Sequence, residues 1–529
     1  MKRIYKITQV ALFGAFIVGC TDLDTAPLSS TITADQKEDV VAADPSKIEA
    51  SVTAITANFT QYAKIYTEDD NVHSDIGYPT IMLATDSRTT DFVADITGYN
   101  WYSNSADYSD CLSTSTATIE FWGTLYNQIY TANAVIGTVD NETSDPTLQF
   151  YLAQALAIRA FDYFTLVQLY QFNYKGHEDA PGVPIITSEN AEEVAANGCA
   201  RSTVKETYEF ILGDLNKAIE LLANTKKTRS DKRYVSLDVA YGIRARVHLT
   251  MHNYADALKD AEAALASTSS VPYSSAAVSK PTFIDIEDAS WMWGILITDK
   301  DRVSTTGICN FPSHMGSLNY GYASVGGWRR ISPKLYNQIP ESDVRKGWFL
   351  DDTGVSVNLP AAAQAYITKK GAPVYTQVKY GPMNDEWGSN NNATDVILMR
   401  VEEMYLIKAE AQAMNNDVSG GVNTLNSFVN TYRDPSYKCT ATTGEAVQEA
   451  VWHQRRIEFW GEGLAYFDIM RLNKGVNRLG CGFPKTAVFN IVAGDPVQIY
   501  SIPNKEVQYN PLLENNPLVS APTPIPDEE

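Results

Sequence analysis

The stretch QRRIEFWGEGLAYFDIMR, residues Gln454 to Arg471, does more than any other to decide the fold of this 529-residue chain. Basic and acidic side chains recur in it at helical spacings, which favour ion pairs between successive turns. Charge clusters on helices are usually solvated faces or scaffold pairs, so we interpret this one as structural; a catalytic carboxylate pair is the alternative. The charged residues concerned are Arg455, Arg456, Glu458, Glu462, Asp468 and Arg471.

Helical periodicity also dominates the chain upstream of this stretch. Thr203 and Glu206 form a capping box, after which residues 208–222 carry apolar side chains on one helical face. Residues 150–170 are apolar nearly all round, which predicts a helix buried inside a bundle. Both patterns predict a protein that is mainly α.

Two further segments, 238–249 and 254–265, predict a pair of helices separated by a short turn. Their small and aromatic packing positions resemble a tetratricopeptide repeat, although no regular array of repeats follows. Residues 395–414 and 422–432 predict a second helical pair late in the chain. The expected fold is therefore a mainly α, tetratricopeptide-repeat-like helical scaffold.

The amino-acid composition changes between residues 271 and 394, which are rich in glycine, serine, asparagine, proline and aromatic residues. Short strands are predicted at 295–297 and 374–378. Long loops on a rigid scaffold usually carry binding groups, so we expect this loop-rich, partly β insertion to carry the ligand site. It divides the body into an N-terminal scaffold at 46–270 and a C-terminal part at 395–529.

The N-terminus predicts export and a lipid anchor. Residues 1–19 combine basic side chains with an apolar run too short to span a bilayer, as in a signal peptide. Cys20 follows an apolar, apolar, glycine sequence that resembles the lipobox of bacterial lipoproteins, so we expect it to become the acylated mature N-terminus. An ordinary secretory signal with an incidental cysteine is the alternative. Residues 20–45 have no periodicity and predict a lipidated flexible tether.

Composition excludes some partners. With 63 acidic and 42 basic residues the formal net charge is −21, whereas a nucleic-acid partner requires a basic surface. The five cysteines besides Cys20 are scattered without a CxxC pair, which indicates neither a disulfide framework nor a zinc site. The sequence is compatible with one long-range disulfide bridge among them.

Four segments of the C-terminal third resemble, in order and spacing, the signature of SusD-like (RagB/SusD) lipoproteins. They are RVEEMYLIKAEA at 400–411, Leu425 with Asn426, the stretch Gln454 to Arg471, and IPNKEVQYNPLLENNP at 502–517. Milder matches upstream extend the likeness over essentially the whole mature chain. The family usually has Glu at the position of Gln454, a departure that affects local salt bridges.

The resemblance implies a lipoprotein anchored in the outer membrane of Bacteroidetes and facing the exterior. Such proteins bind oligosaccharide, or sometimes oligopeptide, and act as a lid on a SusC-like, TonB-dependent β-barrel transporter. The resemblance therefore implies a binding protein and not an enzyme. A surface-anchored glycoside hydrolase is the alternative from another class, and it would need two carboxylates about 5 to 10 Å apart beside the ligand. A scaffold that holds protein partners on its repeats is a third reading.

Sugars bind on flat aromatic faces, with a few polar groups that fix their orientation. In SusD-like proteins these aromatic residues tend to lie in an early loop and in a loop before an Asp-x-Arg motif, here Asp343 to Arg345. The early-loop candidates are Arg88, Tyr99, Trp101, Tyr102 and Asn104; the later ones are Tyr320, Tyr322 and Trp328, with Trp387 from a third loop-like stretch. Core packing is the alternative for each ring, and we favour it for Trp291 and Trp293.

No cofactor is expected. Glu68, Asp69, Asp70 and Asn71 offer the oxygen ligands that calcium prefers, but their spacing fits no EF-hand loop. A calcium ion bound at this run is the alternative.

Overall fold

The computed structural model describes residues 34–62, 72–305 and 307–527. The expected signal peptide at 1–19, the lipidated Cys20 and the calcium candidates at 68–71 lie outside these residues. Within the described part, no helix is both long enough and apolar enough to cross a membrane.

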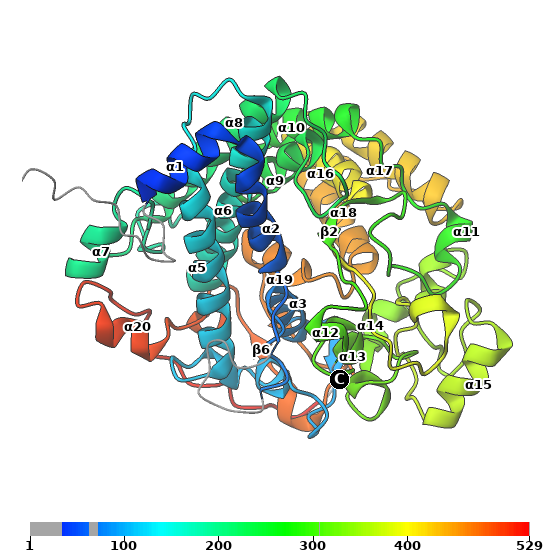
Figure 1. Cartoon of the computed structure of the whole chain (residues 1–529). Helices are drawn as coiled ribbons and strands as arrows, with labels where there is room; N and C mark the ends of the chain where they lie inside the picture. Colours follow the sequence, from blue (N-terminus) through cyan, green and yellow to red (C-terminus); the bar gives the residue numbers. More distant parts are fainter. Residues whose placement is uncertain (1–33, 63–71, 306, 528–529) are drawn as a thin grey trace, which may run out of the picture.

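Helices before and after the insertion form the scaffold (Figure 1). They are α1 (Ala34–Ala43), α2 (Glu49–Ala57), α3 (Tyr78–Ser87), α5 (Thr116–Ile136), α6 (Pro146–Tyr170), α7 (Ala191–Asn197), α8 (Val204–Asn224), α9 (Leu237–Thr250), α10 (Tyr254–Ser267), α16 (Val401–Met414), α17 (Val418–Tyr432), α18 (Gly444–Glu458), α19 (Ala465–Arg471) and α20 (Asn504–Tyr509). Consecutive helices pack in pairs from α5 and α6 through α8 and α9 to α10, which meets α16; α16 packs on α17 and α18. The mainly α, repeat-like scaffold is confirmed.

Shorter elements connect the scaffold and build the insertion. The remaining α-helices are α4 (Ser103–Ala106), α11 (Ser275–Val278), α12 (Arg302–Thr305), α13 (Phe311–Met315), α14 (Pro333–Tyr336) and the ten-residue α15 (Ala361–Lys370). The 3₁₀ helices are η1 (Pro45–Ile48), η2 (Ser109–Cys111), η3 (Tyr322–Ser324), η4 (Val344–Trp348), η5 (Met383–Asp385), η6 (Lys485–Ala487) and η7 (Pro496–Gln498).

The sheets of the described residues are two-stranded and antiparallel. The pairs are β1 (Phe92–Ala94) with β3 (Arg329–Ile331), β2 (Trp291–Ile295) with β4 (Val396–Arg400), and β5 (Val476–Asn477) with β6 (Asn490–Ile491). The strand predicted at 295–297 is displaced, because β2 ends at Ile295. The strand predicted at 374–378 does not form, and Thr376 and Gln377 make only isolated bridges. The helix expected from residue 395 begins instead at Val401, because the five residues before it pair with β2.

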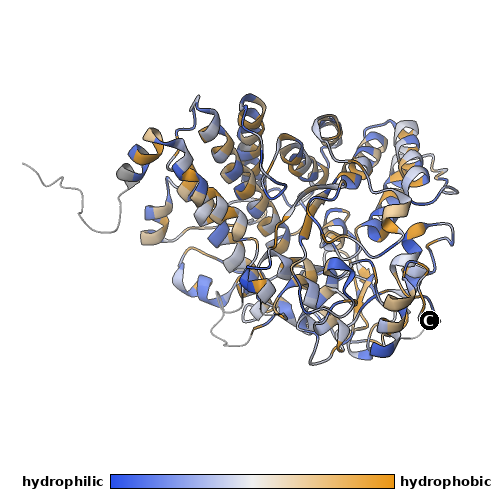
Figure 2. Ribbon diagram, turned by 45° about the vertical axis from the view of Figure 1, so that its right-hand side comes forward, coloured by the Kyte–Doolittle hydropathy of each residue, from blue (hydrophilic) through white to orange (hydrophobic). Residues whose placement is uncertain are grey.

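Several helix predictions are confirmed. Thr203 and Glu206 close a capping box on α8. Helix α6 is buried on every side from Phe150 to Tyr170, as its apolar pattern predicts. Figure 2 shows hydrophobic positions along the packed helices of the scaffold. Trp291 and Trp293 of β2 are fully buried, so they belong to the core.

The flexible tether expected up to residue 45 is corrected in its second half. Residues 34–43 form helix α1, and Val41 is only 3% exposed within the main core. Burial of Val41 holds this segment against the body, whereas the sequence alone showed no periodicity there. The five cysteines of the body are free thiols.

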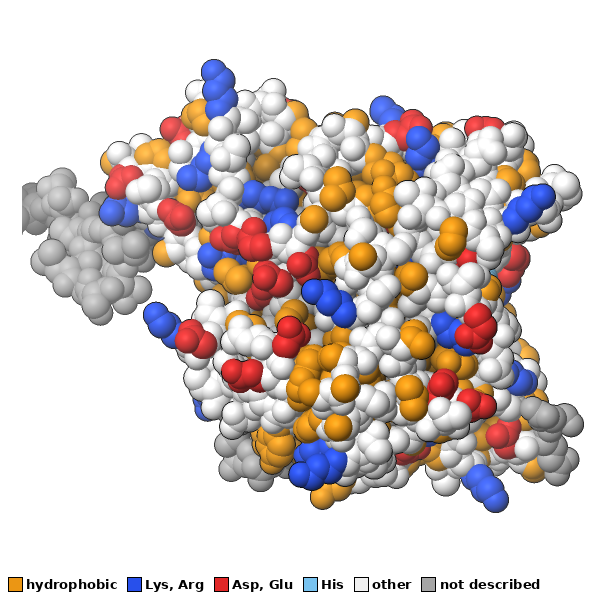
Figure 3. Space-filling view, turned by 90° about the vertical axis from the view of Figure 1, so that its right-hand side faces the viewer, with side chains coloured by type: hydrophobic (Ala, Val, Ile, Leu, Met, Phe, Trp, Pro, Cys, Tyr) orange, Lys and Arg blue, Asp and Glu red, His pale blue; other side chains and the backbone are white. Residues whose placement is uncertain are grey.

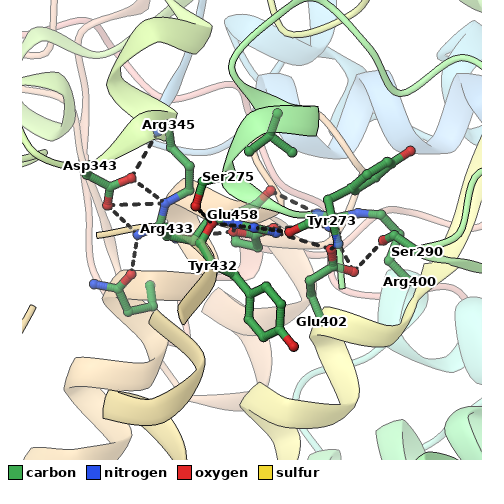
Figure 4. Close-up of polar contacts among 12 residues, drawn as sticks. Tyr273, Ser275, Ser290, Asp343, Arg345, Arg400, Glu402, Tyr432, Arg433 and Glu458 are labelled. Carbon is green, nitrogen blue, oxygen red and sulfur yellow. Dashed lines mark hydrogen bonds and ion pairs between the residues drawn. The ribbon is translucent and has the colours of Figure 1, made fainter. Parts of the chain in front are cut away.

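A buried network of ion pairs joins the C-terminal signature to the insertion (Figure 4). Its members are the cations Arg345, Lys379, Arg400 and Arg433 and the anions Asp343, Glu402, Glu458 and Glu462. Positive and negative groups are equal in number, so the network adds no net charge to the interior. Unpaired buried charges are very costly, which explains why the signature keeps both signs together.

Glu458 at the end of α18 is the centre of this network. It accepts hydrogen bonds from Arg433 at 2.8 Å and from Arg400 at 3.0 Å, and a third from Arg345 at 3.2 Å. Burial opposes ionisation of Glu458, but Arg433, with Arg400 and Arg345, outweighs it and holds the pKa of this carboxyl well below its usual range. The side chain is therefore an ionised structural anchor.

The signature charges are structural, as expected, but most of them pair with other elements and not with the next turn. Arg456 binds Asp91 at 2.6 Å, and Glu462 accepts from Lys379 at 2.5 Å. Arg471 does bind Asp468 three residues before it, at 2.7 Å. Gln454, where the family usually has Glu, accepts from Arg345 at 2.5 Å, so a neutral amide takes that place.

Candidate functional site

Pairing of β1 with β3 brings together two loops that lie far apart in the sequence. Ala94 at the end of β1 stands opposite Arg329 at the start of β3. The early loop, residues 95–102, follows the last residue of β1, and the later loop, residues 320–328, precedes the first residue of β3. Because the strands are antiparallel, both loops lie at the same end of the strand pair.

Glycines let the two loops approach each other closely. A Cβ atom on Gly327 would lie 2.8 Å from the carbonyl oxygen of Tyr99, and one on Gly326 would lie 2.7 Å from the Tyr99 ring. Thr97 Oγ1 also donates a hydrogen bond to the Gly326 carbonyl at 3.4 Å. A side chain at either glycine would push the loops apart.

Three partly exposed rings meet at this junction, and we call His73, Trp101 and Tyr322 the aromatic platform. His73 stacks on Trp101 with 4.8 Å between ring centroids and 26° between planes. Trp101 meets Tyr322 edge to face at 6.0 Å. The His73 Nδ1 atom is hydrogen-bonded to the Tyr322 hydroxyl. Each ring therefore fixes the orientation of the other two.

A buried layer supports the platform from below. His314 stacks on Tyr322 at 5.0 Å and 19°, and its Nε2 atom lies 2.9 Å from the His73 carbonyl oxygen. Arg329 Nε donates to the His314 carbonyl at 2.9 Å, and its Nη1 donates to Asn100 Oδ1 at 2.8 Å. Burial, with Arg329 nearby, lowers the pKa of His314 to about 3, and burial lowers the pKa of His73. Both imidazoles are neutral at pH 7, so the platform offers uncharged ring faces.

Two of the expected ligand contacts are wrong, because their side chains lie in the interior. Arg88 is fully buried, pairs with Asp110 at 2.9 Å and lies 4.0 Å above the Tyr500 ring. Tyr102 is 2% exposed, and its hydroxyl donates to the Ser74 carbonyl at 3.3 Å. In this conformation neither side chain reaches a ligand in solvent.

The remaining expected residues divide between the platform and a neighbouring cluster. Tyr99 is 51% exposed beside the platform, and Asn104 is exposed on α4. Trp328 is only 7% exposed and belongs to a small core within the insertion, against which Trp387 packs, so core packing is the better reading for Trp328. Tyr320 is 46% exposed, and its backbone N–H donates to the Ser389 carbonyl at 2.9 Å.

Sequence reasoning missed His73 and His314, the two histidines of this site. Neither lies in a motif or an aromatic-rich loop, and a single histidine is most often a core or surface residue. Only the tertiary packing places them against Trp101 and Tyr322.

Two family profiles match this chain. One described as "Starch-binding associating with outer membrane" matches residues 35–249, and one described as "SusD family" matches residues 351–518. The chain belongs to the SusD/RagB family. The second profile covers the signature segments at 400–411, Gln454 to Arg471 and 502–517, so the resemblance seen in the sequence is confirmed.

Relatives of this SusD-family chain are distant in sequence. SusD-like protein P2 of Formosa agariphila is 25% identical over 392 residues, which are 67% of this chain and 72% of that protein. A crystal structure of a SusD-like carbohydrate binding protein from Bacteroides vulgatus is 23% identical, with a TM-score of 0.72 over 88% of this chain and 96% of that one. A SusD superfamily protein from Bacteroides thetaiotaomicron is 22% identical, with a TM-score of 0.72 over 89% and 99%. At these identities the solved structures establish a shared fold.

Proposed function

We propose that this protein binds oligosaccharide on the aromatic platform and acts as a lid on a SusC-like, TonB-dependent transporter in the outer membrane. The observation that carries the binding proposal is the stacked, uncharged and partly exposed trio of His73, Trp101 and Tyr322. Flat neutral rings match the apolar faces of sugars, and the neighbouring exposed Tyr99 extends the surface. The family's description as starch-binding supports the same ligand class.

The binding proposal is tested by calorimetric titration with a panel of plant, host and microbial oligosaccharides. For a bound oligosaccharide, Trp101→Ala should weaken affinity about 10- to 100-fold, or about 1.4 to 2.7 kcal/mol, because a central aromatic anchor is removed. Tyr509→Ala is the matched control, since Tyr509 is 84% exposed on α20. Equal losses in both variants, or binding of no member of the panel, would reject the platform as a glycan site.

The same panel separates the glycan proposal from its alternatives. Incubation followed by a reducing-end assay should yield no new ends; product formation would favour the hydrolase. Preferential binding of oligopeptides would keep the lid role and change the ligand class. Both measurements use the lipid-free body, residues 21–529.

The anchor and the partner are tested separately in cells. Cys20→Ala should abolish fatty-acid labelling and release the body from the membrane. Retention of both properties would reject the lipoprotein proposal. Affinity purification of the wild-type chain should recover a large β-barrel protein, and surface accessibility to added protease should show that the body faces the exterior.

A further inference from the structure

A crevice of about 470 Å³ opens on the insertion, apart from the aromatic platform. Helix α14, η4 and the turn at 351–358 form its walls together with Tyr375. Cavities of this volume are typical of small-molecule sites. All of its lining residues belong to the described part of the chain. The loop-rich side of the molecule, with α11 and α15 at the right of Figure 1, is turned to the viewer in Figure 3.

Two tyrosine rings meet in this crevice. Tyr336 and Tyr375 have their ring centroids 5.0 Å apart, with 56° between the planes. Tyr375 has a φ of +66°, a left-handed conformation in which a residue other than glycine is disfavoured. Its backbone is held on both sides, because its N–H donates to Leu350 and its carbonyl accepts from Ile331, each at 3.0 Å. The chain thus keeps a large ring at a position where glycine would relieve the backbone.

Some charged groups around the crevice are paired with each other, and others are not. Asp343 is neutralised by Arg345 at 2.6 Å, and Glu341 pairs with Lys346 at 2.5 Å. The Lys346 ammonium also lies over the Tyr336 ring, 5.0 Å from its centroid, so a cation already covers that face of the ring. Two acidic residues of the crevice wall, Asp351 and Asp352, have no ion pair among the described residues.

These acidic groups exclude anions and accept hydrogen bonds. Burial, with Asp351 and Glu341 nearby, raises the pKa of Tyr336 to about 12, consistent with a negative potential in the crevice. Uronic or sulfated sugars would meet repulsion there. Neutral sugar hydroxyls, in contrast, donate readily to carboxylates and to amide oxygens such as that of Asn337, which also lines the crevice.

We infer that this crevice is a second saccharide site, which takes a neutral sugar ring against Tyr375 with its hydroxyls on Asp352 and Asn337. The inference rests on the proposed function for its ligand class, but it concerns a different surface from the aromatic platform. Two sites on one body would let a longer glycan bind at two points, which raises avidity when both sites can be reached.

Saturation-transfer NMR on the Trp101→Ala protein tests the crevice with the platform weakened. The probes are maltohexaose, xylohexaose and mannohexaose, with trigalacturonate and chitosan trimer as the anionic and cationic comparisons. At least one neutral probe should retain signal, and adding Tyr375→Gly should weaken its binding at least fivefold. Asp352→Asn, on an exposed side chain, should weaken the same probe two- to fivefold. Asp179→Asn, exposed elsewhere, is the matched control for the charge change.

The outcomes separate this inference from the proposed function. If Trp101→Ala alone removes all binding, or if Tyr375→Gly changes nothing while the protein stays folded, the crevice site is rejected and the platform stands. If Trp101→Ala binds the probes as tightly as the wild type does, but Tyr375→Gly alone abolishes binding, the platform is rejected and the crevice stands. Preference for chitosan trimer over every neutral probe rejects the neutral-sugar assignment. Should Tyr375→Gly fail to fold, Asp352→Asn decides.

Discussion

Trp101 and Tyr322 lie edge to face with 6.0 Å between their ring centroids, although one follows β1 and the other precedes β3. His73 lies against both rings, stacked on Trp101 and hydrogen-bonded to the Tyr322 hydroxyl. The platform is therefore a single unit made from three separate segments of the chain.

Binding losses at Trp101 and Tyr322 should not add. In a double-mutant cycle with Trp101→Ala and Tyr322→Ala, we expect a coupling energy of about 0.5 to 1.5 kcal/mol, because each ring orients the other. Calorimetric affinities for one bound oligosaccharide measure it. The pair Trp101→Ala and Tyr509→Ala should add to within about 0.5 kcal/mol. Additivity in both cycles would mean that the rings act independently.

Gly327→Ala should weaken binding without removing any ring. Its Cβ would lie 2.8 Å from the Tyr99 carbonyl oxygen, so the two loops must move apart, at a cost of about 1 to 3 kcal/mol in the free energy of unfolding. Chemical denaturation and titration measure the two effects. Gly98→Ala, in the same early loop but with no atom within 4 Å of its Cβ, should leave both unchanged.

Acid should destabilise the protein through His314. Its pKa is lowered to about 3 by burial first and Arg329 second, whereas the unfolded value is about 6.5. The unfolded chain therefore binds a proton that the folded chain does not, and stability falls as the pH drops below about 6.5. From this residue we expect a loss of about 2 kcal/mol between pH 8 and pH 5.

His314→Gln provides the test of that assignment. Its side-chain N–H group can still donate to the His73 carbonyl, but glutamine does not titrate. The variant's stability should fall less between pH 8 and pH 5 than that of the wild type. Identical pH profiles in denaturant titrations would place the acid sensitivity elsewhere.

Asp86 should act in the opposite direction. Burial raises its pKa to about 7, although its Oδ2 atom accepts from the Gly463 N–H at 3.0 Å. The folded chain thus holds a proton that the unfolded chain loses above about pH 4, so stability is lost as the pH rises from 4 to 7. Asp86→Asn keeps the acceptor and should gain up to about 4 kcal/mol over the wild type at pH 8, and little at pH 4. Asp179→Asn, an exposed control, should show no such gain; a pH-independent difference at Asp86 would contradict the assignment.

The buried ion network should fail when its central carboxylate is neutralised. Glu458→Gln leaves Arg400 and Arg433 with too little negative charge in the interior, so we expect a loss of about 3 to 5 kcal/mol in unfolding free energy. Glu449→Gln removes a half-exposed ion pair with Lys474 and should cost less than about 1 kcal/mol. Similar losses in the two variants would show that burial does not set the strength of these pairs.

Local patterns predicted much of the scaffold. The capping box at Thr203 and the apolar run at 150–170 place helices α8 and α6 correctly, because helix formation depends on neighbours three and four residues apart. The sequence missed the strand at 396–400, whose pairing with β2 depends on residues about a hundred positions away. The short pairing of β1 with β3 was missed for the same reason.

By itself, the sequence determined the family, the helical scaffold and the two loops that carry aromatic residues, because these follow from residue type and short-range spacing. Only the tertiary structure decided which of those residues face solvent. Arg88 and Tyr102 come from the same early region as Trp101, yet packing buries the first two and leaves Trp101 partly exposed. Burial and charge pairing depend on contacts between distant segments, so the spacing that identified Gln454 to Arg471 did not reveal that most of its charges bind other elements.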